Sequence, residues 1–243
     1  MAKKRKRAVK KTSPSTVAVV TDPAAYVRQF VSPAVFFHTS PRIGNSGVST
    51  RKVALGLDLG TRCGYAYAVQ TANDLWEFNS WFMGVWDLSS GRYDSGNIGF
   101  FRLYAFLDAI NPCAVFYEKV RFTPAGMNNF NAARIMARAA TASEFLGAMR
   151  QTMLSWCNNN DAAATGIPIG TIKLRATGSG RVGKPDVIQA CNREYGTTFD
   201  PETYKTSGAD NVADACWVLR CGLERYGTAI SAGVFDGQSK ETQ

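Results

Sequence analysis

The sequence predicts an α/β domain in which a mixed five-stranded sheet is flanked by helices. Short apolar runs of strand length are followed by longer segments whose apolar residues recur at helical spacing. The first three strand-like runs are close enough in sequence to pair as hairpins, whereas helical segments separate the later ones. Hairpin strands followed by strand–helix units are typical of a mixed sheet with helices on its faces.

The five expected strands are short and mostly apolar, as strands buried inside a sheet are. A turn at 60–64, with a glycine at each end, separates the first strand from the second. The fourth and fifth strands each follow a helical segment. The expected strands are residues 53–57, 65–69, 81–86, 113–117 and 167–172.

Four longer segments are expected to be helical and to cover the sheet. Asn111 and Pro112 end the first of them, because proline cannot continue a helix. Pro185 suits the first turn of the third, and Gly196 suits its end. The expected helices are residues 98–110, 127–149, 185–195 and 210–225, the second of which is rich in alanine.

The composition fits one large domain with a basic tail. Of the 243 residues 45% are hydrophobic and 12% aromatic, which excludes globally disordered and fibrous classes. The net charge is +9, but seven of the 28 basic residues lie within residues 1–12, so the remainder carries only about +2. We expect a basic disordered tail at 1–16, an N-terminal extension and linker at 17–50, the main folded domain at 51–228 and a C-terminal tail at 229–243.

The tail segment 3–7, Lys-Lys-Arg-Lys-Arg, has two interpretations, sequence-independent DNA affinity and nuclear import. No apolar run reaches the roughly 18 residues that span a bilayer, and none follows the first charges directly. We therefore expect no membrane segment and no secretory signal. Six scattered cysteines without a Cys-x-x-Cys pair, and a single histidine at His38, argue against a zinc site and favour reduced thiols inside a cell.

Four acidic residues occupy positions that differ from those of the other acids. Asp58 follows a buried strand directly, and Glu118 ends the next strongly apolar strand. Asp210 and Asp214 are four residues apart, so they share one face at the start of a helix. Buried carboxylates that converge repel one another unless a cation lies between them, and oxygen ligands alone favour Mg²⁺ or Mn²⁺.

Each of these acids also has an ordinary structural interpretation when it is taken alone. Asp58 caps a turn, and Glu118 pairs with Lys119 or Arg121 at the strand end. Asp210 is the N-cap of its helix, a common use of aspartate. The joint pattern is more specific, because all of these acids lie at strand ends or at one helix start in one sheet topology.

At these residues the chain resembles the RuvC-type Holliday junction resolvases of the RNase H-like superfamily. Segment 55–66, Leu-Gly-Leu-Asp-Leu-Gly-Thr-Arg-Cys-Gly-Tyr-Ala, is similar to the first strand of that family, with its metal-binding aspartate and Gly-Tyr pair. Segment 115–120 resembles the strand that carries the catalytic glutamate, and 172–184 a stretch with two functional lysines around a Gly-Thr/Ser-Gly turn. Segment 210–215 is similar to the final acidic helix, and the matches cover about 51–225 in the family's order.

The resemblance implies an RNase H-like fold and a crossover junction endodeoxyribonuclease. Such an enzyme is a metal-dependent, structure-selective hydrolase of DNA recombination and repair, which cleaves four-way or other branched DNA as a homodimer. Two Mg²⁺ ions per site are implied, for which Mn²⁺ substitutes, and no small-molecule cofactor or membrane partner. The implied catalytic residues are Asp58, Glu118, Asp210 and Asp214 as metal ligands, with Lys173 and Lys184 on the scissile phosphate.

The chain departs from the family at one position in the last motif. Bacterial members usually carry an acid three residues before the final aspartate, and this position is Asn211 here. Asp210 lies one residue earlier and faces the same side of the helix, because spacings of three and four share a face. Asp210 and Asn211 are therefore alternative candidates for the fourth ligand.

Further basic and aromatic residues are candidate DNA contacts. Phe122 stacks on an unpaired base near a junction centre, or else packs in the core. Arg134 and Arg138 lie four apart on a helix face that contacts either DNA or solvent. The full set of candidates is Lys119, Arg121, Phe122, Arg134, Arg138, Arg175 and Arg181.

Two other functions stay open at this point. The motif 58–61, Asp-Leu-Gly-Thr, also begins the ATP-binding fold of actin and sugar kinases, but roughly 190 residues after the linker are too few for its two domains. A non-catalytic branched-DNA-binding protein of the same fold is the second, if Asn211 disables the site. The expected location is intracellular: the bacterial host cytoplasm if the chain is of phage or other viral origin, or the nucleus if segment 3–7 is an import signal.

Overall fold

The structure is a computed structural model that describes residues 19–20, 52–71, 75–76, 81–90, 97–119, 132–235 and 237. For residues 19–20, 81 and 132–139 it describes the backbone alone. None of the helices in these ranges is long and apolar enough to cross a membrane.

The mixed five-stranded sheet flanked by helices is confirmed. Strand β2 lies in the middle, pairs antiparallel with β3 and parallel with β5, and the order of the described strands is β1-β4-β3-β2-β5-β6. A sixth strand of two residues, β1, joins the edge next to β4. The strands are β1 Val19–Val20, β2 Val53–Asp58, β3 Arg62–Val69, β4 Trp81–Asp87, β5 Ala114–Lys119 and β6 Ala163–Pro168.

The last strand lies earlier in the chain than the sequence predicts. The prediction placed it at 167–172, whereas β6 ends at Pro168 and the helix α5 begins at Ile169. Proline has no N–H to donate to a strand ladder, and Pro168 is the N-cap of α5 with extended backbone. The apolar residues that follow belong to this helix, in which Ile172 is buried and Ile169 is 47% exposed.

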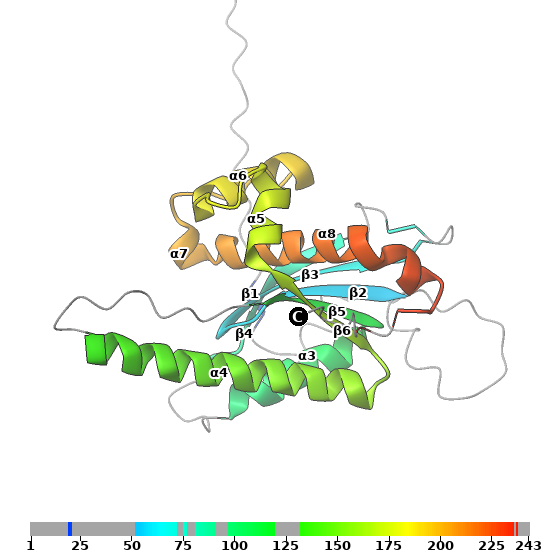
Figure 1. Cartoon of the computed structure of the whole chain (residues 1–243), viewed down its shortest axis with the longest axis horizontal. Coiled ribbons are helices and arrows are strands. Elements are labelled where there is room, and N and C mark those ends of the chain that lie inside the picture. Colours follow the sequence, from blue (N-terminus) through cyan, green and yellow to red (C-terminus); the bar gives the residue numbers. More distant parts are fainter. Residues whose placement is uncertain are drawn as a thin grey trace, which may run out of the picture.

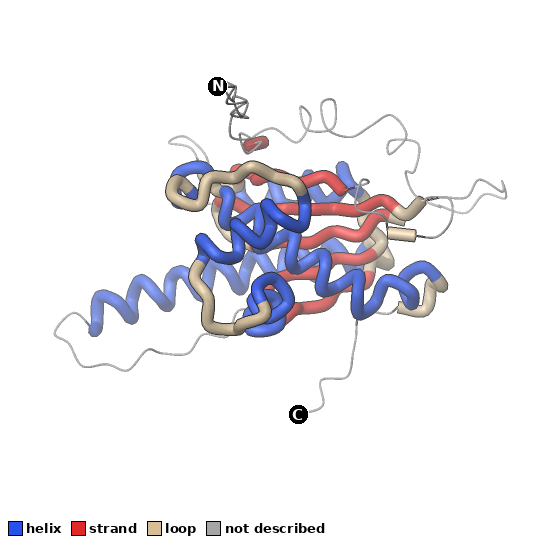
Figure 2. Tube along the Cα trace, turned by 90° about the horizontal axis from the view of Figure 1, so that it is seen from above, coloured by secondary structure: helices blue, strands red, loops and turns tan. Residues whose placement is uncertain are grey.

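The six helices in the described part of the chain lie on the two sides of the sheet (Figure 1). Helices α3 and α4 cover one face, and α8 lies across the other with α5 and α6 beyond it (Figures 1 and 2). The helices are α3 Ile98–Ile110, α4 Ala132–Asn159, α5 Ile169–Thr177, α6 Lys184–Tyr195, α7 Tyr204–Ser207 and α8 Ala209–Ser231.

Two of these helices extend beyond their predicted ends. Helix α4 continues past 149 because Met153, Trp156 and Cys157 prolong its buried face, and its predicted start at 127 lies outside the described residues. Helix α8 continues past 225 to Ser231, where Lys52 Nζ donates to the backbone oxygens of Ile230 and Ser231 at 2.7 and 2.8 Å. A cation at the end of a helix satisfies carbonyls that have no partner inside it.

Two glycines allow α8 to lie directly on the central strands. A Cβ atom at Gly56 of β2 would come within 2.6 Å of the Ala215 backbone oxygen. A Cβ atom at Gly64 of β3 would come within 1.9 Å of the Asn211 backbone oxygen. The absence of side chains at these two positions therefore brings the first turns of α8 onto the ends of β2 and β3.

Candidate active site

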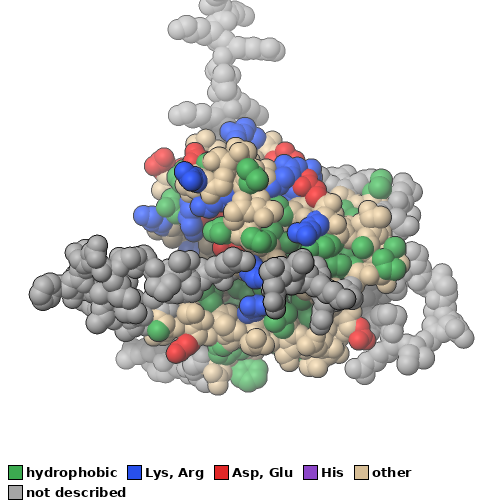
Figure 3. Space-filling view, viewed as in Figure 1, with side chains coloured by type: hydrophobic (Ala, Val, Ile, Leu, Met, Phe, Trp, Pro, Cys, Tyr) green, Lys and Arg blue, Asp and Glu red, His purple; other side chains and the backbone are tan. Residues whose placement is uncertain are grey.

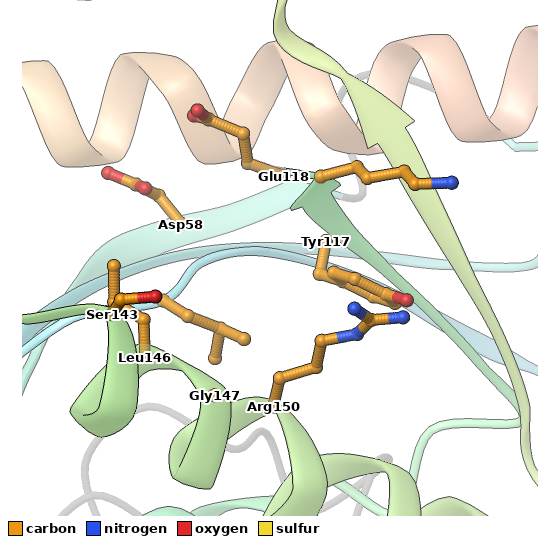
Figure 4. A pocket seen from close by; sticks show the side chains of 9 residues that line it. Asp58, Tyr117, Glu118, Ser143, Leu146, Gly147 and Arg150 are labelled. Carbon is orange, nitrogen blue, oxygen red and sulfur yellow. The ribbon is translucent and has the colours of Figure 1, made fainter. Parts of the chain in front are cut away.

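Two of the four predicted acids are neighbours at the edge where the parallel strands β2 and β5 end. Leu57 pairs with Tyr117 in the sheet register, so Asp58 and Glu118 follow at adjacent positions of the two strands. Figure 4 shows both carboxylates pointing to the same side of these strand ends, toward the helix that crosses above them. The other two acids, Asp210 and Asp214, lie in the first two turns of α8.

The four carboxylates act on one another electrostatically. Burial is the largest cause that raises the pKa of Asp58 well above 3.8, and the charges of Asp214, Glu118 and Asp210 raise it further. Burial and the charges of Glu118 and Asp210 raise the pKa of Asp214 from 3.8 to about 7. Burial also raises the pKa of Glu118. Full ionisation of the cluster is therefore unfavourable in the folded protein without further positive charge.

Two lysines from the neighbouring helices α5 and α6 reduce this charge only in part. The Lys184 ammonium forms an ion pair with the Asp210 carboxylate, although the Lys184 side chain is 50% exposed. Partial burial acts to lower the pKa of Lys184, but the bond to Asp210 and the charges of Asp214 and Asp58 outweigh it, so that this pKa is raised. Lys173 Nζ donates to the Val182 backbone oxygen at 3.0 Å. The charges of both lysines lower the pKa values of Glu118 and Asp214.

The chemistry of this donor set fits a hard divalent cation. Its four carboxylates supply only oxygen, the ligand that Mg²⁺ and Mn²⁺ prefer, and the charges of the two lysines lower but do not cancel the rise in the pKa values of Glu118 and Asp214. Within the described residues, no three of these side chains are already drawn together as ligands around one ion. The Lys184 ammonium, which is paired with Asp210, lies among these carboxylates.

The structure separates the roles of the two candidates for the fourth ligand position. Asp210 is 9% exposed and pairs with Lys184, and the N-cap of α8 is Gly208 rather than Asp210. Asn211 uses its side-chain amide elsewhere, because Nδ2 donates to the Arg62 backbone oxygen at 2.7 Å. The expectation that Asp210 caps its helix is therefore wrong, and its carboxylate lies on the side of the cluster.

Arg62 is a residue that the sequence reasoning missed, and it joins two parts of the site. Its guanidinium donates to the backbone oxygens of Thr206 and Ser207 at 2.8 and 3.2 Å, at the end of α7. With the bond from Asn211, these contacts fix the turn after Asp58 to the start of α8. No local sequence pattern predicts these hydrogen bonds, since the partners are about 145 residues apart in sequence.

A pocket of about 190 Å³ adjoins the carboxylates on the α4 side. Asp58 and Glu118 line one wall, and Ser143, Gly147 and Arg150 of α4 line the opposite wall (Figure 4). The spacing of the three α4 residues puts them on one helix face, a signal that was readable in the sequence. The contacts predicted on the same helix are Arg134 and Arg138 instead.

The predicted DNA contacts fall into three groups. Lys119 lines the pocket, and Arg181 is exposed in the loop between α5 and α6. Arg175 is engaged on α8, where it bonds both carboxylate oxygens of Glu224 at 2.6 and 2.7 Å. Outside the described part of the chain lie Arg121, Phe122 and the side chains of Arg134 and Arg138. On the face shown in Figure 3, Lys and Arg side chains gather where α5 and α6 lie in Figure 1.

No protein-family model matches the chain, and no curated protein matches it. Among solved structures the chain is similar to RuvC of Thermus thermophilus, with 16% identity, a TM-score of 0.46, and coverage of 72% of this chain and 97% of that one. The same enzyme in complex with a Holliday junction substrate has 16% identity and a TM-score of 0.49, with coverage of 75% of this chain and 97% of that one. The yeast mitochondrial Holliday junction resolvase has 14% identity and a TM-score of 0.45, with coverage of 74% of this chain and 81% of that one.

Proposed function

We propose that this protein is a metal-dependent endodeoxyribonuclease that hydrolyses phosphodiester bonds in branched DNA, four-way junctions above all. The observation that supports it is the cluster of four carboxylates at the ends of β2 and β5 and the start of α8, bordered by two lysines. A group with uncompensated negative charge at a sheet edge destabilises the fold unless it binds a cation.

Asp58, Glu118, Asp214 and Asp210 would hold the metal, two Mg²⁺ ions with Mn²⁺ as a substitute. Bound there, such ions lower the pKa of an attacking water and stabilise the leaving 3′ oxygen. Burial of Asp58 and Asp214 raises the pKa of each, so the metal-free cluster favours protons and exchanges them for a cation.

Lys184 and Lys173 would bind the scissile phosphate and compensate the charge that develops on it. The Lys184 ammonium is half exposed and already lies beside Asp210, so it reaches both the cluster and solvent. Lys173 is held by the Val182 oxygen in the loop region between α5 and α6. Both cations come from helices on the α8 side of the sheet.

The preference for branched DNA rests on the four motifs that resemble the RuvC-type resolvases in the family's order. Two symmetrical cuts across a junction require two active sites, so the proposal includes a homodimer. Sedimentation of the free protein and of its junction complex tests this part separately from catalysis.

The decisive experiment is cleavage of a labelled four-way junction with and without Mg²⁺, beside a linear duplex of the same sequence. Asp58→Asn should abolish cleavage while junction binding persists, because one ligand is lost and the basic contacts remain. Asp161→Asn is the matched control, since Asp161 is exposed and its left-handed backbone, with φ 54°, suits asparagine equally well. Wild-type cleavage by Asp58→Asn would refute the assignment, and junction binding without any cleavage would favour a non-catalytic binding protein.

A further inference from the structure

We infer that the pocket beside the carboxylates binds the phosphodiester next to the scissile one, and that Arg150 is the residue that binds it. The inference rests on the proposed function and names a contact that no sequence motif assigns. Asp58 and Glu118 line one wall of this pocket, and Ser143, Gly147 and Arg150 line the other.

The carboxylates have basic residues on both sides. Lys173 and Lys184, which would bind the scissile phosphate, come from α5 and α6 on the α8 side of the sheet. Arg150 belongs to α4, which covers the opposite face (Figure 1). A strand that crosses the carboxylates thus meets cations on both sides, with the scissile phosphate at the lysines and its neighbour at Arg150.

The Arg150 side chain is held in place for such a contact. Its guanidinium carbon lies 5.3 Å from the centre of the Tyr117 ring, and Tyr117 directly precedes Glu118 in β5. In Figure 4 the guanidinium lies close beneath this ring, on the side that faces α4. A planar cation placed against an aromatic ring keeps its N–H edge for an oxyanion, and arginine pairs with phosphate through two parallel hydrogen bonds.

The helix surface beside Arg150 leaves room for a backbone to approach. A Cβ atom at Gly147 would meet nothing within 4 Å, so the space above this turn is open. One turn earlier, Ser143 adds a hydroxyl that can donate to a phosphate oxygen. Together these residues form the α4 wall of the pocket opposite the carboxylates, with a hydroxyl at one end and a cation at the other.

This role predicts a characteristic kinetic effect. The neighbouring phosphate keeps its charge throughout the reaction, so Arg150 binds substrate and transition state equally. Loss of the contact should raise KM about 10- to 100-fold and leave kcat nearly unchanged, as expected when one charge-assisted hydrogen bond is lost. If Arg150 only packs on Tyr117, its removal would lower stability, and the effect on KM would not depend on which phosphate of the substrate is neutral.

The test combines Arg150→Ala with junctions in which single phosphates near the cleavage site are replaced by neutral methylphosphonates. Arg225→Ala is the matched control, because Arg225 is also exposed and also lies 5.3 Å from a tyrosine ring centre, that of Tyr226. Arg225 is eleven residues beyond Asp214 on α8, or about 16 Å along the helix. Arg150→Lys keeps the charge without the paired N–H edge and should give an intermediate KM.

For the wild type, one neutral linkage adjacent to the scissile bond should raise KM about as much as Arg150→Ala does, and the two changes should not add. Arg225→Ala should remain sensitive to that linkage. Full additivity at every position, with folded Arg150→Ala protein, would overturn the inference. The same cycle on binding affinity keeps the two hypotheses apart: a wild type that binds junctions without cutting them refutes the nuclease, while non-additivity in Kd still supports the pocket.

Discussion

Replacing Asp214 by asparagine should make the metal-free protein more stable while it abolishes cleavage. Burial, together with the charges of Glu118 and Asp210, raises the pKa of Asp214 from 3.8 to about 7. The folded state therefore binds the Asp214 proton more tightly than the unfolded state does. Asp214 therefore does not lower the free energy of unfolding below about pH 4, where it is protonated in both states. The loss of free energy of unfolding grows as the pH rises to about 7 and then stays constant.

The difference between these two pKa values sets the size of the effect. It corresponds to about 4 kcal/mol of folding free energy that the wild type lacks at pH 8. The asparagine amide recovers most of this, less about 1–2 kcal/mol for burying a new polar group. We expect a net gain of about 2–3 kcal/mol, which for a domain of this size raises Tm by roughly 5–10 °C.

Thermal unfolding in a chelator, at several pH values between 4 and 8, measures this difference directly. The gain of Asp214→Asn over the wild type should be full at pH 8 and disappear near pH 4, where both side chains are neutral. Mg²⁺ should raise the Tm of the wild type more than that of the variant, because a ligand is missing from the variant's site. Asp161→Asn, at an exposed position, should match the wild type throughout.

A variant that is less stable than the wild type at pH 8 would refute the reasoning. So would an equal difference at pH 4 and pH 8, because the effect would then not come from the carboxylate charge. Either result would mean that Asp214 is compensated in the folded protein and that the cluster does not need a cation.

Three further predictions concern other parts of the molecule. Asp210→Asn should lower Mg²⁺-dependent cleavage by orders of magnitude. It should change the free energy of unfolding by less than about 1 kcal/mol, because Asp210 pairs with the half-exposed Lys184 and is not a helix cap. Unchanged cleavage would exclude Asp210 as a metal ligand. Gly64→Ala should lower the free energy of unfolding in urea by about 3 kcal/mol or more, since the new Cβ would lie 1.9 Å from a backbone oxygen of α8. The control Gly170→Ala lies in α5, where a Cβ would meet nothing within 4 Å, and should be neutral or stabilising. Deleting residues 1–12 should reduce the slope of log affinity against log salt by up to about 0.9 per lost phosphate contact, and an unchanged slope would favour a targeting role.

The sheet could be predicted from the sequence wherever strands are strongly apolar. β2 and β5 are continuous buried runs, and each ends in the predicted acid or next to it. β6 was predicted too late in the chain because its first four residues, Ala-Ala-Thr-Gly, are small and alternate in burial, while the isoleucines at 169 and 172 beyond it belong to a helix. Hydrophobicity identifies a buried strand reliably, but it does not show where an edge strand gives way to a helix.

Only the part of the site that lies on the strongly apolar strands could be predicted. Parallel strands end at one edge of a sheet, so the proximity of Asp58 and Glu118 follows from the strand assignment alone. The approach of α8 depends on glycines at two positions of the strands below it, and nothing in the α8 sequence indicates that contact. The helical spacing of Ser143, Gly147 and Arg150 was readable in the sequence, but the contact of Arg150 with Tyr117 was not, because Tyr117 lies on a strand that is distant in sequence.

The amide at position 211 also has a physical explanation within this fold. Asn211 donates to the Arg62 backbone oxygen, while the Arg62 guanidinium holds the end of α7. An ionised carboxylate only accepts hydrogen bonds, so an acid at 211 could not donate to the Arg62 backbone oxygen. Its negative charge would instead repel that oxygen. With the donor required at 211, the remaining inward-facing position in the first turn of α8 is Asp210, where the carboxylate meets Lys184. The shift of the acid by one residue is thus coupled to the link between the turn after β2 and the start of α8, and both belong to a single arrangement of the site.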